Sequence, residues 1–259
     1  MASATRTPII TKMYILRTRI KKDIVSEFLP PIKPSKRVII ICGGMPSYPS
    51  KKDLIIFLAN KGYWVFLPRY RGSWESDGSF LRISPHQDVL DVINQLSSGF
   101  SDLWSKKKYK VKDPRVYLIG SSFGGPAALL ASRDKRVRKA VVLSPVTDWR
   151  EETKEEPIDW LEKFTKTAFG SGYRFTKKDW RKLKAGKFYN PTAEISTLNP
   201  AKILIIHPED DKFAYAKTSK KFAEMLGCKL ILLKEGGHLS TSDVMKPDFW
   251  KKINNFIKN

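Results

Sequence analysis

A serine flanked by glycines is the sequence feature with the clearest chemical meaning. Residues 120–124 read Gly-Ser-Ser-Phe-Gly and follow directly on the apolar run VYLIG. A G-x-S-x-G sequence between a strand and a helix forms a sharp turn that exposes the serine hydroxyl above the sheet. Glycines on both sides remove side chains that would collide with the strand and the helix. Because only the register 120/122/124 has glycine at both positions, Ser122 rather than Ser121 is the predicted nucleophile.

A serine hydroxyl becomes a good nucleophile only when a base removes its proton, and imidazole suits that task near neutral pH. The chain has three histidines. His238 lies in Gly-Gly-His after the last predicted strand, and it alone follows the candidate acids in the chain order serine, acid, histidine. We expect His86, in the first turn of a predicted surface helix, and His207, at the end of a predicted strand, to be structural.

The acid that orients the base should follow the strand that precedes the strand of His238. Three successive carboxylates, Glu209, Asp210 and Asp211, stand at that place. Asp211 lies farthest along the turn and is favoured, with Asp210 next and Asp148 a more distant alternative. The acid would fix the imidazole tautomer and stabilise the imidazolium.

An oxyanion hole needs two backbone N–H donors. Phe123, which follows the nucleophile, supplies one, and the glycine-containing loop after the first buried strand should supply the other from Gly44 or Met45. The histidines do not stand at metal-ligand spacing, and the acidic runs do not match a calcium loop. The sequence therefore predicts neither a metal nor a cofactor.

Six apolar runs predict the strands that would position these groups. They are buried on both faces, as in a parallel sheet, and lie at residues 37–44, 63–68, 116–120, 140–144, 203–207 and 229–233. Helices are expected between them, at residues 53–60, from Ser84, from Gly124 to Ala131, after Phe213 and at residues 243–257. Ser84 and Gln87 together predict a capping box. The alternation implies a doubly wound, mostly parallel sheet with functional residues at the carboxyl ends of its strands.

Two further segments flank or interrupt this alternation. Residues 13–20 and 24–29 predict an antiparallel hairpin at the amino terminus. Residues 147–199 form a charged, aromatic-rich stretch that we interpret as a lid-like insertion within one domain of residues 1–259. The aromatic side chains of this insertion either line an acyl pocket or form a small core of their own: Trp149, Trp160, Phe164, Phe169, Tyr173 and Trp180.

Composition narrows the class of protein. Lys and Arg total 48 against 26 Asp and Glu, a formal net charge of +22. The basic residues are spread in short clusters without a nucleic-acid-binding motif, so we expect a solvated basic surface; an acidic partner would dock at residues 174–187. No signal peptide or membrane span is predicted, and the protein is expected to be cytoplasmic. Cys42 and Cys228 are expected to be reduced thiols.

Taken in order, several of these motifs resemble the catalytic domain of the prolyl oligopeptidase family and the related dienelactone-hydrolase-like esterases. The resemblance runs from residue 37 to residue 259, and the matching pieces are Gly43-Gly44, Tyr70-Arg71-Gly72-Ser73, GSSFGG, SPVTDW at 144–149, LIIHPEDD and EGGH. It implies an α/β-hydrolase fold and a Ser122/Asp211/His238 triad that attacks an ester or amide carbonyl through an acyl-enzyme. It also makes Asp148 structural.

The chain departs from the family pattern at three points. Cys42 stands where the family commonly has histidine, Pro208 stands where it has glycine, and the chain has no room for a β-propeller. We therefore expect an esterase acting on small acyl esters, with a peptidase for short peptides as the alternative. A non-catalytic binding protein with a basic surface is the alternative of another class.

Overall fold

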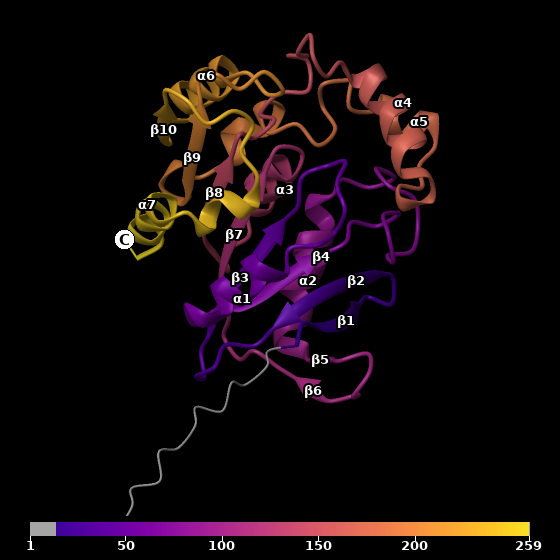
Figure 1. The fold of residues 1–259 in the computed structure, drawn as a ribbon, viewed down its shortest axis with the longest axis vertical. Helices are drawn as coiled ribbons and strands as arrows, with labels where there is room; N and C mark the ends of the chain where they lie inside the picture. Colours follow the sequence, from indigo (N-terminus) through magenta and orange to yellow (C-terminus); the bar gives the residue numbers. More distant parts are fainter. Residues whose placement is uncertain (1–13, 259) are drawn as a thin grey trace, which may run out of the picture.

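A computed structural model describes residues 14–258, which form an eight-stranded sheet and the helices around it (Figure 1). The strand order is β1-β2-β4-β3-β7-β8-β9-β10. The strands are β1 (Leu16–Ile20), β2 (Ile24–Leu29), β3 (Arg37–Cys42), β4 (Trp64–Pro68), β7 (Arg115–Ser121), β8 (Val137–Leu143), β9 (Ile203–Pro208) and β10 (Lys229–Leu233). The six neighbouring strands β4-β3-β7-β8-β9-β10 pair in parallel, whereas β2 is antiparallel to both β1 and β4. The predicted sheet and hairpin are confirmed, although Met13, the predicted start of the hairpin, lies outside the described residues.

Helices cover both faces of this sheet. On one face, Ile39 and Ile41 of β3 pack with side chains of α1 (Lys52–Asn60) and α7 (Pro247–Lys258). On the other face, Val38 and Ile40 belong to the cluster formed with α2 (His86–Ser98), α3 (Gly124–Ala131) and α6 (Ala216–Leu226). Alternate residues of one strand thus enter different cores, as a doubly wound sheet requires. None of the helices within residues 14–258 is long and apolar enough to cross a bilayer.

The start of α2 differs from the prediction. Ser84 does not cap the helix, because its hydroxyl bonds His86 Nδ1 at 2.7 Å, while Gln87 Nε2 lies 2.7 Å from Nε2 of the same ring. His86 is also buried rather than on the surface, and burial with the adjacent Arg133 lowers its pKa to about 4. The side chains of Ser84 and Gln87, which were expected to form the capping box, therefore bond the imidazole of His86 instead of the backbone of the helix.

Two shorter elements also differ from the prediction. A small separate hairpin, β5 (Phe100–Ser101) with β6 (Lys108–Tyr109), was not predicted. The last predicted helix is divided into a 3-10 turn at Thr241–Met245 and α7. Pro247 begins α7, which explains the division, because proline is restricted to the first turn of a helix.

Residues 147–199 contain α4 (Ile158–Phe169) and α5 (Lys177–Arg181), which Figure 1 shows set apart from the strands of the sheet. The alternative prediction that the aromatic side chains of this insertion form a small core of their own is wrong for the described residues. Trp149, Tyr173 and Trp180 are buried in the main core. Trp160 and Phe164 are exposed and stack on each other with ring centroids 4.9 Å apart.

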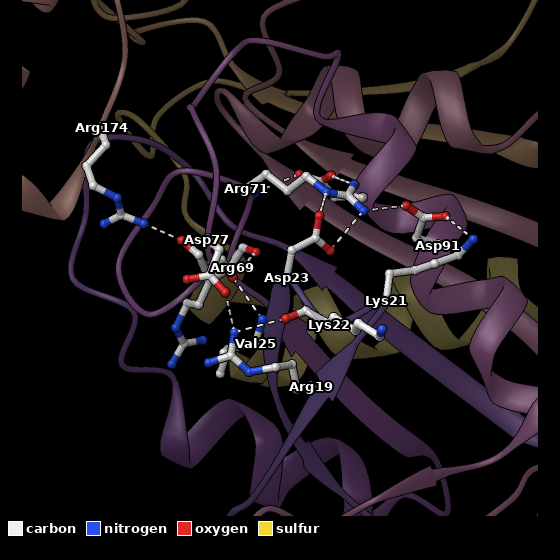
Figure 2. A network of polar contacts seen from close by, with 12 residues as sticks. Arg19, Lys21, Lys22, Asp23, Val25, Arg69, Arg71, Asp77, Asp91 and Arg174 are labelled. Carbon is white, nitrogen blue, oxygen red and sulfur yellow. Dashed lines mark hydrogen bonds and ion pairs between the residues drawn. The ribbon is translucent and has the colours of Figure 1, made fainter.

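Arg71 joins the amino-terminal hairpin to α2 (Figure 2). Its guanidinium donates to Asp23 in the turn between β1 and β2, at 2.6 Å, and to Asp91 of α2, at 2.8 Å. It also pairs with Asp88, whose side chain is 2% exposed and accepts the backbone N–H of Arg71 at 2.9 Å. Arginine suits this place because its planar fork can serve several carboxylates at once.

Replacing Arg71 with methionine is expected to lower the free energy of unfolding by about 3 kcal/mol, because the buried charge of Asp88 would lose its partner. Arg19→Met is the matched control, since Arg19 pairs with Asp77 at 2.6 Å in a largely exposed position and should cost under about 1 kcal/mol. Urea unfolding of both variants measures the difference. Equal losses would contradict a structural role for the Arg71 network.

Candidate active site

Ser122 occupies the turn between β7 and α3, with a φ of 49°. A left-handed backbone is costly for serine, and such strain is typical of functional turns. The flanking glycines are required by close packing: a Cβ on Gly120 would lie 2.5 Å from the carbonyl oxygen of Gly124, and one on Gly124 would lie 2.1 Å from that of Cys42. The chain can therefore make this turn only with glycine on both sides of Ser122.

His238 lies on the loop after β10 and is paired with Asp211 on the turn after β9. Its Nδ1 is 2.8 Å from Oδ2 and 3.0 Å from Oδ1 of that carboxylate. Asp211 has a fully buried side chain, while 24% of the His238 side chain is exposed. Because carboxylate oxygens accept hydrogen bonds, Nδ1 must be the donor, which leaves the lone pair of the neutral ring on Nε2.

The carboxylate of Asp211 accepts hydrogen bonds from other groups besides His238. Burial opposes its charge, but hydrogen bonds from His207, His238 and the backbone N–H of Ala214 outweigh burial and hold the pKa of this carboxyl well below its ordinary value. The Oδ1 atom accepts the N–H groups of Phe213 at 2.9 Å and Ala214 at 3.1 Å. Asp211 is therefore a fixed, ionised acceptor at neutral pH.

His207 is buried behind this carboxylate, and its contact with Asp211 was missed by the sequence analysis. Its Nε2 is 3.1 Å from Asp211 Oδ2 and 2.7 Å from the carbonyl oxygen of Ala214. Both are acceptors, so Nε2 carries the proton, and Nδ1 can accept from Ser219 Oγ at 2.8 Å. The spacing of four residues between His207 and Asp211 at a strand end was the available signal.

The two alternative acids lie elsewhere. Asp210 accepts the backbone N–H groups of Gly236, at 3.3 Å, and Gly237, at 2.9 Å, so it braces the loop of His238 rather than its ring. Asp148 bonds Arg150 and the side-chain amide of Asn190, the latter at 2.8 Å. Of the three candidates, the structure brings Asp211 to the imidazole.

The candidate oxyanion donors flank Ser122. Within residues 14–258 the backbone N–H groups of Phe123, Gly44 and Met45 form none of the backbone hydrogen bonds of turns and loops. They are therefore kept as the candidate oxyanion donors. The loop of Gly44 and Met45 is fastened to the insertion: Tyr173 Oη lies 3.1 Å from the N–H and 3.2 Å from the carbonyl of Ser47. Thr165 Oγ1 also contacts Met45 Sδ at 3.7 Å.

These groups meet in one pocket of about 310 Å³, lined by Ser122, His238, Gly44 and Met45 among others. Both hydrogen bonds of the His238 ring within the described chain go to Asp211, so the structure contains no hydrogen bond between His238 and the Ser122 hydroxyl. Such contacts commonly tighten only when substrate binds. Within residues 14–258, no group of three or more His, Cys, Asp or Glu side chains is arranged to hold a metal ion.

Glu156, from the insertion, also lines this pocket and was not singled out by the sequence analysis. Burial raises its pKa to about 7; His238 lowers it in part and Asp211 adds to the increase. Its ordinary pKa is 4.5. An acid with a raised pKa in the folded state binds more protons there than in the unfolded chain, so its contribution to stability falls as pH rises from about 4.5 to 7.

Glu156→Gln is accordingly expected to raise the free energy of unfolding at pH 8 by about 1 kcal/mol, after allowance for partial solvent exposure, and to change it little at pH 4.5. Urea unfolding at the two pH values measures the change. Glu151→Gln, at an exposed position of the same segment, should show no such pH-dependent gain. A loss of stability in Glu156→Gln at pH 8 would show that the charged carboxylate stabilises the fold, contrary to this expectation.

Comparison with known proteins identifies the family and the fold of the chain. The model of the prolyl oligopeptidase family matches residues 50–259. An esterase of Pyrococcus furiosus is 16% identical with a TM-score of 0.68, over 99% of this chain and 95% of the esterase. The acylaminoacyl peptidase of Pyrococcus horikoshii is 18% identical with a TM-score of 0.59, over 95% of this chain but 40% of the peptidase.

No curated protein matches the chain in sequence. The solved structures share its α/β-hydrolase fold, as the sequence predicted, and at these identities they show the fold alone. The family model covers most of the chain. The chain therefore belongs to the prolyl oligopeptidase family.

Proposed function

We propose that this chain is a serine hydrolase that cleaves carboxylic esters, or amides, through an acyl-enzyme on Ser122. His238 acts as the general base and Asp211 orients it. The observation that carries the proposal is the pairing of His238 Nδ1 with Asp211 in the pocket that also holds the strained turn of Ser122. Family membership supports the same class of chemistry.

The proposed reaction follows from the donors and acceptors present. Nε2 of His238 takes the proton of Ser122 as Oγ bonds to the carbonyl carbon, and the N–H groups of Phe123 and of Gly44 or Met45 bind the resulting oxyanion. The imidazolium then gives that proton to the departing alcohol or amine. Water, deprotonated by the same ring, breaks the acyl bond to Ser122 and restores the hydroxyl.

Esters are the favoured substrates. The chain matches the Pyrococcus furiosus esterase over nearly all of that protein, but only 40% of the acylaminoacyl peptidase. The insertion of residues 147–199 contributes Glu156 and Phe164 to the pocket and would shape access as a lid. Cleavage of short peptides is the alternative within the family, since the same groups attack an amide carbonyl.

A fluorophosphonate probe tests the proposal, together with p-nitrophenyl esters of increasing acyl length and short peptide anilides. We expect stoichiometric labelling of Ser122, located by peptide mass spectrometry, and faster turnover of the esters. Faster turnover of the anilides would assign a peptidase instead. A folded protein that neither labels nor turns over any of these substrates would contradict the hydrolase.

Some cations of the basic segment at residues 174–187 have partners within the chain. Arg174 donates to the carbonyl groups of Trp74 and Ser171, each at 3.0 Å. Lys182 pairs with Asp179 at 2.8 Å, and Lys184 pairs with Asp159 at 2.6 Å. These three of the seven cations in the segment already have partners within the chain, and we propose no nucleic-acid or acidic-protein partner for them.

A further inference from the structure

Glu156 is a carboxylate in the pocket of Ser122 and His238 that the proposed reaction does not use. Its backbone N–H donates to Thr153 Oγ1 at 3.1 Å, but its carboxylate forms no hydrogen bond or ion pair with another residue of the described chain. Glu156 lines this pocket together with Ser122 and His238, and His238 and Asp211 both act on the pKa of its carboxyl group. A partly buried acid without a partner is costly to keep.

The acidic residues beside it in the sequence do have partners. Glu152 accepts the backbone N–H of Ile158 at 3.0 Å, and Glu155 accepts the hydroxyl of Tyr215 at 3.3 Å. These contacts secure the segment before α4. Glu156 is the member of this group that turns into the pocket, and no contact within residues 14–258 explains its carboxylate as a structural anchor.

Two phenyl rings line the same pocket. Phe164 and Phe213 are 40% and 47% exposed, and the Phe213 ring centroid is 5.7 Å from that of His238. The face of an aromatic ring attracts cations, and proteins use aromatic rings to recognise quaternary ammonium ligands. A carboxylate and exposed phenyl rings that line one pocket therefore supply the two features that recognise an ammonium ion.

One cation also lines the pocket and contacts a segment other than the insertion. Lys51, just before α1, donates to Ser242 Oγ at 3.3 Å. Burial lowers the pKa of Lys51, and the nearby carboxylate of Asp243 opposes that change. Lys51 thus already interacts with the 3-10 turn at Thr241–Met245, whereas the carboxylate of Glu156 has no hydrogen bond or ion pair within residues 14–258.

We propose that Glu156 selects substrates that carry an ammonium group near the ester or amide bond, with Phe164 and Phe213 packing against that group. This inference rests on the proposed hydrolase function and names its substrate class. The ammonium would replace the water lost by the buried carboxylate. A charge-assisted contact of this kind is expected to favour the cationic substrate by about tenfold or more in kcat/KM.

Matched substrate pairs test the inference on each side of the scissile bond. For the leaving group, the pair is butyrylthiocholine and its carbon isostere, in which tert-butyl replaces trimethylammonium. For the acyl group, the pair is the p-nitrophenyl esters of aminocaproic and heptanoic acid, in which methyl replaces ammonium. The ratio of kcat/KM within a pair isolates charge from shape.

The wild-type protein is expected to favour the cationic member of at least one pair by about tenfold or more. In Glu156→Gln this ratio should fall to near one, and in Glu156→Lys it should invert. Glu151→Gln removes one negative charge from an exposed place in the same segment and should keep the wild-type ratio. A loss of the ratio in both glutamine variants would overturn the inference by assigning the preference to the overall field of the segment.

A wild-type measurement makes the test independent of any variant's folding. Phenyltrimethylammonium should compete with a neutral p-nitrophenyl ester more strongly than tert-butylbenzene does. Neutral esters turned over with no preference for a cation in substrate or inhibitor would overturn the role of Glu156 and leave the hydrolase standing. Absence of both fluorophosphonate labelling and turnover would overturn the two proposals together.

Discussion

Replacing Ser122 with alanine is expected to lower kcat for ester hydrolysis by about a million-fold and to abolish fluorophosphonate labelling. The alanine variant loses the atom that forms the acyl bond, while the Asp211–His238 pair and the candidate oxyanion N–H groups remain. Any residual rate would come from water attacking a carbonyl held in the oxyanion hole. Single-turnover and steady-state assays with one p-nitrophenyl ester measure the loss.

Ser121 supplies the matched control for this substitution. It adjoins Ser122, its side chain is buried, and it ends β7. Ser121→Ala removes the same hydroxyl group one residue away, and its kcat should stay within about tenfold of wild type because the side chain lies outside the required register. Comparable losses in the two variants would count against Ser122 as the nucleophile.

Replacing Asp211 with asparagine is expected to lower kcat by about ten-thousand-fold. The amide matches the carboxylate in shape, but it can donate a hydrogen bond to His238 Nδ1. That bond would stabilise the tautomer with the proton on Nε2, which cannot accept a proton from serine. The substitution also removes the charge that would stabilise the imidazolium. The pH dependence of kcat, measured with a neutral ester, would show whether strong base restores part of the rate.

Asp210→Asn tests the neighbouring carboxylate with the same chemical change. Asp210 accepts the N–H groups of Gly236 and Gly237, and an amide oxygen can still accept such bonds. We expect a loss of about tenfold or less, as is common when a supporting contact is weakened. A larger loss for Asp210→Asn than for Asp211→Asn would reverse their proposed roles.

The sheet could be predicted from the sequence because most of its strands stand out as apolar runs. Buried parallel strands are continuous apolar runs, as in β9, Ile203–Pro208. The run at Lys229–Leu233 was predicted with its observed bounds, but it was wrongly expected to be buried on both faces, because β10 is the edge strand and is partly exposed. The turn of Ser122 was equally clear, since glycine is the only residue that fits at positions 120 and 124. Both features depend on residues that are close together in the sequence, so sequence patterns are enough to predict them.

Features that depend on burial and on the path of a loop were not accessible in this way. Ser84 was expected to cap α2, but the buried ring of His86 competes for its hydroxyl. The sequence placed Asp210 and Asp211 side by side, and only the path of the turn separates the acid facing His238 from the one facing Gly237. Glu156 reaches the pocket from the insertion, which no periodicity of that segment indicates.

The attachment of Tyr173 and Thr165 to the loop of Met45 bears on how substrate range can be changed in this molecule. In a modular enzyme, a recognition segment can be exchanged with a relative's while the reaction rate is preserved. Here the exchanged segment would carry away the side chains that hold Ser47 and Met45 in place. A chimera designed for new specificity would therefore need to retain these anchoring residues. Without them, its kcat is expected to fall even if its selectivity improves.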